Sequence, residues 1–167
     1  TKTQRRWFID GGEQEIWDMG LNEIFEGAIR KGVTAFYEQT LEMIEVQRPE
    51  VIGHLDKIKM HNKERFFSTK DKWYQDLIAA CLYQIKKQST VLEINTRGLY
   101  KGRSDELFPS IDIAKKAQRM GIPLLLSSDA HQPDELDGAF DSSLTLLKEN
   151  GIHEWVEYDG QNWINIH

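Results

Sequence analysis

The stretch IPLLLSSDAH, residues 122–131, decides the fold class of this chain. Its apolar run 122–126 predicts a buried strand, because a short apolar run that begins after a helix stop such as Gly121 is typical of one. Asp129 and His131 follow at once. Two earlier stretches show the same order of apolar strand and polar end, VIGH at 51–54 and VLEIN at 91–95. Three predicted strands of the chain therefore each end in a group able to bind a metal or a phosphate.

Helical patterns fill the intervals between these strands. Apolar residues recur at helical spacing in four segments, 33–46, 73–85, 111–120 and 136–149. Helices that alternate with strands are typical of parallel strands with flanking helices, so the sequence predicts an open α/β sheet or a (β/α) barrel. Residues 7–9 predict a further short strand. At the end, Asp159-Gly160 between 154–158 and 162–166 predicts a β-hairpin-like pair with a type I′ turn.

The composition excludes several classes of protein. The 167 residues carry a formal net charge of −6, with 40% hydrophobic and 29% charged residues, which fits one globular domain. The single cysteine, Cys81, cannot form an internal disulfide, so we expect a reducing compartment, the cytoplasm. No run approaches the roughly 18 apolar residues of a membrane span, so no membrane partner is expected. The negative charge argues against nucleic acid and leaves open a local basic pocket for a small anionic substrate.

The strand ends carry the candidate site. Sites in α/β proteins are built at the carboxyl ends of parallel strands, so His54, Asn95 and the later polar residues should converge at one edge. Asp129 and His131 stand two residues apart and could reach one divalent metal; the alternative is an Asp that starts a turn beside an exposed His. His54 could be a metal ligand or hydrogen-bonded scaffolding. Arg97 could grip a phosphate or form a surface salt bridge.

Other notable residues have simpler interpretations. Glu93 lies inside a predicted strand, where we expect it to support the site and not to bind metal itself. His61 lies in the charged stretch 57–65 and is expected to be solvated, while Cys81 lies in an apolar helical stripe and is expected to be an inert core thiol. The sequence contains no glycine-rich dinucleotide signature, P-loop or Ser-His-Asp arrangement.

Together, these motifs resemble those of a known superfamily. The stretches VIGHLD (51–56), LEINTRG (92–98) and SSDAH (127–131), in this order, are similar to the later motifs of the polymerase and histidinol phosphatase (PHP) superfamily, in its histidinol-phosphatase branch. FIDGG (8–12) and FPS (108–110) also resemble that branch. The resemblance implies the later part of a distorted (β/α)7 barrel and a multinuclear metal site. It also implies hydrolysis of L-histidinol phosphate to L-histidinol and phosphate in histidine biosynthesis.

The resemblance assigns roles to individual residues. His54, Asp129 and His131 match metal ligands, so two or three divalent ions are implied, and mixed nitrogen and oxygen ligands suit Zn, Mn or Fe alike. Asp129 and His131 are also the implied catalytic pair, because the metals they hold would activate a water. The implied substrate-binding residues are Arg97 on the phosphate, Asn95 beside it and Arg103 as a second arginine.

One departure from the family pattern is large. Such enzymes open with an H-x-H strand, yet this chain has no H-x-H and no histidine before His54. A closed barrel also needs roughly 200 or more residues. We therefore expect residues 1–167 to form a single domain that is the C-terminal portion of a barrel and is poorly active or inactive alone. We also expect an open sheet edge that associates with a second chain or with the missing N-terminal segment. A truncated pseudo-enzyme is the alternative.

Two other functions compete with this interpretation. A PHP phosphoesterase that acts on nucleotides or oligonucleotides belongs to the same enzyme class, but the Asn95-Thr96-Arg97 match and the lack of a basic surface disfavour it. A non-catalytic fragment or scaffold that binds no metal belongs to a different class. Metal content separates the last of these from the enzymes.

Overall fold

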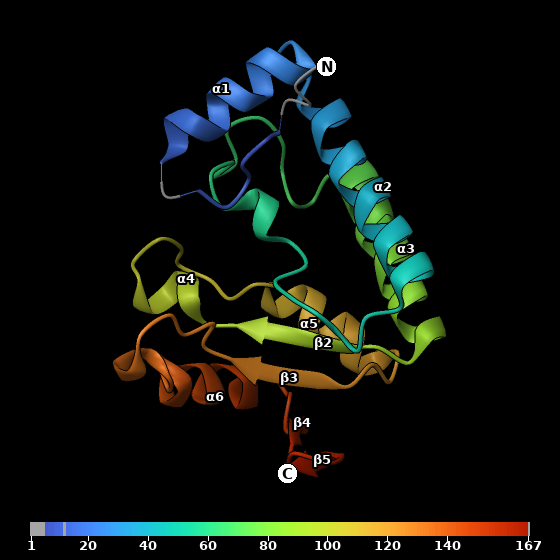
Figure 1. Ribbon diagram of the computed structural model, residues 1–167, viewed down its shortest axis with the longest axis vertical. Helices are drawn as coiled ribbons and strands as arrows, with labels where there is room; N and C mark the ends of the chain where they lie inside the picture. Colours follow the sequence, from blue (N-terminus) through green and yellow to red (C-terminus); the bar gives the residue numbers. More distant parts are fainter. Residues whose placement is uncertain (1–5, 12, 167) are drawn as a thin grey trace.

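A parallel sheet of three strands forms the centre of the protein. The computed structural model describes residues 6–11 and 13–166. The strands are β1 (Val51–Ile52), β2 (Val91–Asn95) and β3 (Leu124–Ser127), and they lie in the order β1-β2-β3. In register, Ile52 pairs with Leu92, and Asn95 pairs with Ser127. All three predicted parallel strands are thus present, with β1 parallel to β2 and β2 parallel to β3. The arrows of β2 and β3 point the same way in Figure 1.

Helices connect the strands as the alternation predicts. The α-helices are α1 (Gln14–Phe25), α2 (Ile29–Gln47), α3 (Lys72–Gln88), α4 (Arg97–Tyr100), α5 (Ile111–Arg119) and α6 (Phe140–Glu149). Two single 3-10 turns, η1 (Lys57–Lys59) and η2 (Pro133–Glu135), precede α3 and α6. α2 and α3 run side by side, and α5 and α6 lie along the sheet (Figure 1). The architecture is therefore mixed α/β with a parallel sheet.

Alternate side chains of β2 face the apolar core and the candidate site at the sheet edge. Leu92 and Ile94 are buried in the apolar core together with residues of α2, α3 and α5. Glu93 and Asn95 lie on the other face, because successive side chains of a strand point to opposite faces. The sheet has three strands, and the part of the chain that the structure describes forms no closed barrel. The predicted parallel strands with flanking helices are therefore present, whereas the described residues do not close them into a barrel.

The C-terminal pair is a hairpin with a longer turn than predicted. β4 (Trp155–Tyr158) and β5 (Trp163–Ile166) pair antiparallel, and Tyr158 faces Trp163. The backbone N–H of Asp159 donates to the Asn162 carbonyl, and the Asp159 carboxylate accepts the N–H groups of Gln161 and Asn162. Four residues thus form the turn, so the two-residue type I′ turn is wrong, because the Asp159 side chain organises the loop instead.

The N-terminal segment also differs from the sequence expectation. Residues 7–9 form no strand, and the Trp7 indole N–H donates instead to the Trp17 carbonyl of α1 at 2.8 Å. Trp7 packs in the angle between α1 and α2, where a Cβ on Gly20 would come within 2.4 Å of its ring. The end of the FIDGG match, Gly12, lies outside the described residues.

The charged stretch 57–65 is more buried than its composition predicts. His61 is buried, not solvated, and its Nε2 donates to the Gly11 carbonyl at 2.6 Å. Lys59 is also buried and pairs with the fully buried Asp56, Nζ to Oδ2 at 2.8 Å. These polar groups can leave water because each finds a partner inside the protein. No periodic pattern in the sequence marks this burial.

Cys81 has the environment that the sequence predicts. Its side chain is fully buried in the core, and this burial raises the pKa of the thiol to about 12. A thiol with so high a pKa is not a nucleophile at neutral pH. Among the helices of the described residues, none combines the length and apolar character that crossing a bilayer requires.

Candidate active site

Two neighbouring strands bring Asn95 and Asp129 together at the carboxyl edge of the sheet. Asn95 is the last residue of β2, and Asp129 follows β3 by two residues. The Asn95 Nδ2 donates to the Asp129 Oδ2 at 3.3 Å, across a separation of 34 residues. This contact follows from the pairing of Asn95 with Ser127, because parallel strands in register end side by side. The convergence expected at this edge is therefore present for these two residues.

Glu93 connects the ends of β1 and β2. Its carboxylate Oε2 accepts the backbone N–H of His54 at 2.8 Å and the Nδ2 of Asn95 at 3.3 Å. His54 has a positive φ of 33°, so its backbone conformation needs support from its neighbours. A Cβ at Gly53 would lie 3.2 Å from the same Oε2, which explains the glycine there. Glu93 thus holds two candidate residues without itself facing solvent.

The Asp129 and His131 side chains lie on one short loop. The His131 Nδ1 is 3.7 Å from the Asp129 Oδ1 and 2.9 Å from the Asp129 backbone oxygen. The His131 side chain is 62% exposed, whereas that of Asp129 is 27% exposed. On its inner side, the Asp129 Oδ2 lies 4.0 Å from the Lys57 Nζ, which is also 3.9 Å from the Asp10 carboxylate. Lys57, which the sequence analysis did not single out, thus places a positive charge beside Asp129.

Arg97 is held by neighbouring protein groups. Its Nη1 donates to the Asp129 carbonyl at 2.6 Å, to the Tyr100 hydroxyl at 3.0 Å and to the Glu135 carboxylate at 3.0 Å. Glu135 also pairs with Lys101. Lys101, the backbone N–H of His131 and Arg97 together lower the pKa of the Glu135 carboxyl to about 2. Arg97 therefore takes part in a largely buried ion pair next to Asp129 and not in the surface salt bridge that was one of the two alternatives, while its phosphate-binding role stays a prediction.

Arg103 lies at a different place. Its side chain is exposed and lines a hollow of about 400 Å³ together with Lys59, Lys63 and Glu106, none of which belongs to the sheet edge described above. Only its backbone contacts the neighbourhood of Arg97, since the Arg103 N–H donates to the Gly98 carbonyl. The structure thus does not bring the two predicted phosphate-binding arginines together.

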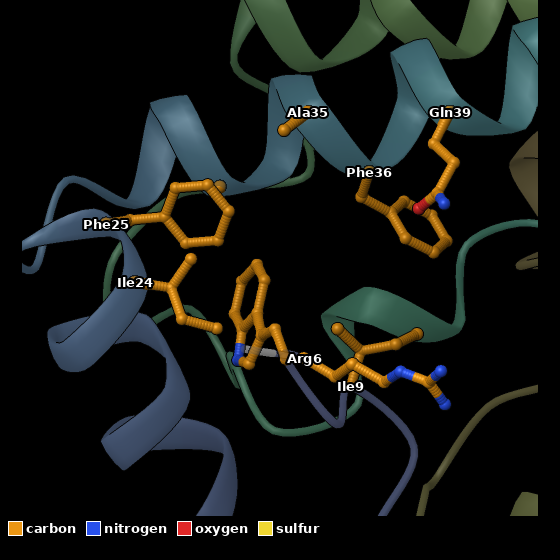
Figure 2. A pocket seen from close by; sticks show the side chains of 9 residues that line it. Arg6, Ile9, Ile24, Phe25, Ala35, Phe36 and Gln39 are labelled. Carbon is orange, nitrogen blue, oxygen red and sulfur yellow. The ribbon is translucent and has the colours of Figure 1, made fainter. Parts of the chain in front are cut away.

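A second hollow, of about 600 Å³, lies between the N-terminal segment and helices α1 and α2. Figure 2 shows Ile24, Phe25 and Phe36 pointing into it, with Gln39 and Arg6 at its rim. None of the candidate site residues lines it. No His, Cys, Asp or Glu is among the residues that line it.

The metal site expected from the resemblance is incomplete among the residues that the structure describes. Within residues 6–11 and 13–166, no group of three or more His, Cys, Asp and Glu side chains is placed to hold a metal ion. Asp129 and His131 supply two donors of suitable type, and His54 is tied to Glu93 by its backbone. Structural zinc sites use four protein ligands and catalytic zinc sites use three. The described residues therefore do not fit a metal by themselves.

Comparisons with known proteins place this fold among histidinol phosphatases. The chain superposes on the solved structure of the Listeria monocytogenes protein hisK, assigned as a histidinol phosphatase, with a TM-score of 0.68 and 21% identity over 78% of this chain and 50% of that one. Most of this chain thus shares its fold with about half of that protein.

Sequence matches add a more specific relationship. The chain is 26% identical over 110 residues to the histidinol-phosphatase of Bacillus subtilis, covering 66% of this chain and 41% of that protein. It is 36% identical over 64 residues to a protein of Deinococcus radiodurans named "Probable histidinol-phosphatase", covering 38% of this chain and 24% of that one. No family model matches. The chain is related to the histidinol-phosphatases of the PHP superfamily, and it spans less than half the length of the curated relatives it matches.

Proposed function

We propose that this chain is the C-terminal portion of a barrel enzyme that hydrolyses L-histidinol phosphate to L-histidinol and phosphate, as a step of histidine biosynthesis. The sequence match to the Bacillus subtilis histidinol-phosphatase carries the proposal. The joining of Asn95 and Asp129 at one sheet edge supports it, because a hydrolase needs its polar groups at one place. The single buried thiol favours a cytoplasmic location for this enzyme.

The residues of the edge supply parts of what phosphate hydrolysis needs. Water attacks phosphorus, the bond to the histidinol oxygen breaks, and the leaving oxygen takes up a proton. The ammonium of Lys57 and the guanidinium of Arg97 place positive charge beside Asp129, where it would attract the anionic substrate. Asp129 and the exposed imidazole of His131 are the groups that could hold or release protons.

Metal dependence is a further part of the proposal. We expect two or three divalent ions, Zn, Mn or Fe, in the complete protein, with His54, Asp129 and His131 among the ligands. Because these three do not form a complete set, further ligands would have to come from a polypeptide outside the described residues. Among the described residues β1 pairs with β2 alone, so its outer edge is where such a polypeptide or a second chain would add.

Phosphate release from L-histidinol phosphate tests this proposal. The 167-residue chain should release phosphate slowly or not at all, and addition of the upstream part of a complete histidinol-phosphatase should raise the rate. The Asp129→Ala variant should abolish that gain. Robust metal-dependent release by the isolated chain would show that its own residues complete the site. Failure of every combination would overturn the proposed function.

A non-catalytic scaffold is the second candidate function, and the incomplete set of metal donors favours it. Elemental analysis of the purified chain, alone and with the added upstream part, separates the two. A scaffold stays free of metal in both cases. The nucleotide-directed enzyme would instead release phosphate from a nucleotide faster than from histidinol phosphate.

A further inference from the structure

The loop 128–131 leaves β3 in an unusual conformation. Asp129 has a positive φ of 53°, in the left-handed region that residues with a side chain rarely adopt. Aspartate adopts this region more readily than most residues, and contacts with the surrounding structure select it over the other conformations. The loop also carries the two side chains, Asp129 and His131, on which the proposed function depends. The groups that fix the backbone of this loop therefore control the position of both side chains.

Three side chains each fix a different backbone group of the loop. The Tyr100 hydroxyl donates to the Ser128 carbonyl at 2.9 Å. The Arg97 Nη1 donates to the Asp129 carbonyl at 2.6 Å, and the Glu135 Oε2 accepts the His131 N–H at 2.9 Å. The loop is thus held at three successive points from two other segments, α4 and η2.

The three side chains also hold one another. The Arg97 Nη1 is 3.0 Å from both the Tyr100 hydroxyl and the Glu135 Oε2, and Lys101 binds the second oxygen of Glu135. The Arg97 and Glu135 side chains are only 14% and 9% exposed. Water competes weakly for hydrogen bonds in such a place, so removal of one group leaves its partners unsatisfied.

Packing contacts hold the ring of Tyr100, in addition to the hydrogen bonds that hold its hydroxyl. A Cβ added at Gly138 would come within 2.7 Å of the Tyr100 Cδ1, so the backbone after η2 lies directly against the ring. Thr96, just before α4, donates to the Gly138 carbonyl at 2.6 Å and keeps this backbone in place. The ring and the turn therefore form one packed unit around the loop.

From these contacts we infer that Tyr100 and Glu135 are positioning residues of the site, which hold Asp129 and His131 through the backbone of loop 128–131. The inference extends the proposed function, in which neither residue has a role. It also gives Arg97 a second task, because its Nη1 anchors the loop and only the rest of its planar group could bind a phosphate.

Amide hydrogen exchange of the 167-residue chain, followed residue by residue by NMR, tests this inference without any substrate. Tyr100→Phe keeps the ring and removes only the hydroxyl, and Glu135→Gln keeps the shape and removes the charge. Each should speed exchange of the His131 amide at least tenfold, while amides of β2 and α3 keep their wild-type rates. The matched control is Tyr83→Phe, since Tyr83 is 66% exposed on α3 and should leave His131 unchanged.

Activity gives a second, separate measurement. In whichever form of the protein releases phosphate from histidinol phosphate, Tyr100→Phe should lower kcat about tenfold with little change in KM, because a misplaced Asp129 and His131 affect turnover more than binding. Exchange at His131 within twofold of wild type in both variants would overturn the inference. Faster exchange throughout the chain would overturn it too, because it would show a general loss of stability. Faster exchange at His131 alone, with no phosphatase activity in any form, would support the positioning role and refute the proposed function.

Discussion

Replacing Lys59 by methionine should destabilise this protein far more than the loss of an ordinary surface lysine. The Lys59 Nζ lies 2.8 Å from the Asp56 Oδ2 and 2.9 Å from Glu106, and the Lys59 and Asp56 side chains are 4% and 0% exposed. Methionine keeps the apolar stem but removes the charge, so it leaves a carboxylate in the interior without its cation. The second oxygen of Asp56, Oδ1, already has no hydrogen-bond partner within the described residues.

The size of the effect follows from this geometry. Breaking a buried ion pair by removing one partner costs about 3–5 kcal/mol. The Ser110 N–H continues to donate to the Asp56 Oδ2 at 3.1 Å, so we expect the lower end, about 3 kcal/mol. With a urea dependence of about 2 kcal/mol/M, the unfolding midpoint should fall by about 1.5 M. Tryptophan fluorescence and circular dichroism in urea measure that midpoint.

Low pH should reduce the loss of stability in the Lys59→Met variant. Burial raises the pKa of the Asp56 carboxyl even when Lys59 is present. Without the lysine, the pKa of Asp56 in the folded state should lie still further above its value in the unfolded state. Between these two pKa values the folded state holds a proton that the unfolded state has lost, so the free energy of unfolding falls as the pH rises. The difference between variant and wild type should therefore be largest at neutral pH and shrink as the pH is lowered.

An exposed ion pair of the same chain is the control. Lys72 and Asp76 are 2.8 Å apart on α3, with side chains 88% and 63% exposed. Lys72→Met should change the free energy of unfolding by about 0.5 kcal/mol or less. If Lys59→Met shifted the midpoint no more than Lys72→Met, the argument that Asp56 depends on its buried cation would be refuted.

Three further predictions concern the core residues Leu92 and Cys81 and the glycine of α4, Gly98. Leu92→Ala should lower the free energy of unfolding by about 2–5 kcal/mol in urea titrations, because Leu92 is fully buried, whereas Leu136→Ala, at a 68% exposed position, should cost about 0.5 kcal/mol or less. Cys81, with a thiol pKa of about 12, should resist a disulfide-exchange reagent at pH 8 and react once urea unfolds the chain; rapid reaction of the native protein would contradict its burial. Gly98→Ala should cost about 1–3 kcal/mol in thermal unfolding, since its Cβ would come within 2.7 Å of the Phe108 ring, and an unchanged Tm would disprove that contact.

The regular elements were predictable because their information is local. The predicted strand 91–95 coincides with β2, since an apolar run between a helix and a Thr-Arg-Gly segment has few other solutions. The predicted helix 33–46 lies within α2, and the predicted strand 122–126 overlaps β3. Convergence of Asn95 and Asp129 was predictable as well, because it follows from parallel pairing alone.

Contacts between distant segments could not be predicted in the same way. The burial of His61 depends on the Gly11 carbonyl, which is 50 residues away in sequence. The partners of Arg97 depend on where η2 places Glu135, and no periodic pattern specifies that position. The placement of Arg103 beside Lys59 and Lys63 likewise brings together residues about 40 apart in sequence.

Several links of the candidate site join residues far apart in the chain. Asn95 and Asp129 are 34 residues apart, Tyr100 and Ser128 are 28 apart, and Thr96 and Gly138 are 42 apart. Closing loops of this length costs conformational entropy before any contact compensates for it. These links can therefore form only once β2 and β3 have paired. During synthesis, the site can take shape only after the segment that contains Gly138 has left the ribosome, so a nascent chain that ends at β3 would have its parallel strands but not yet the fixed loop.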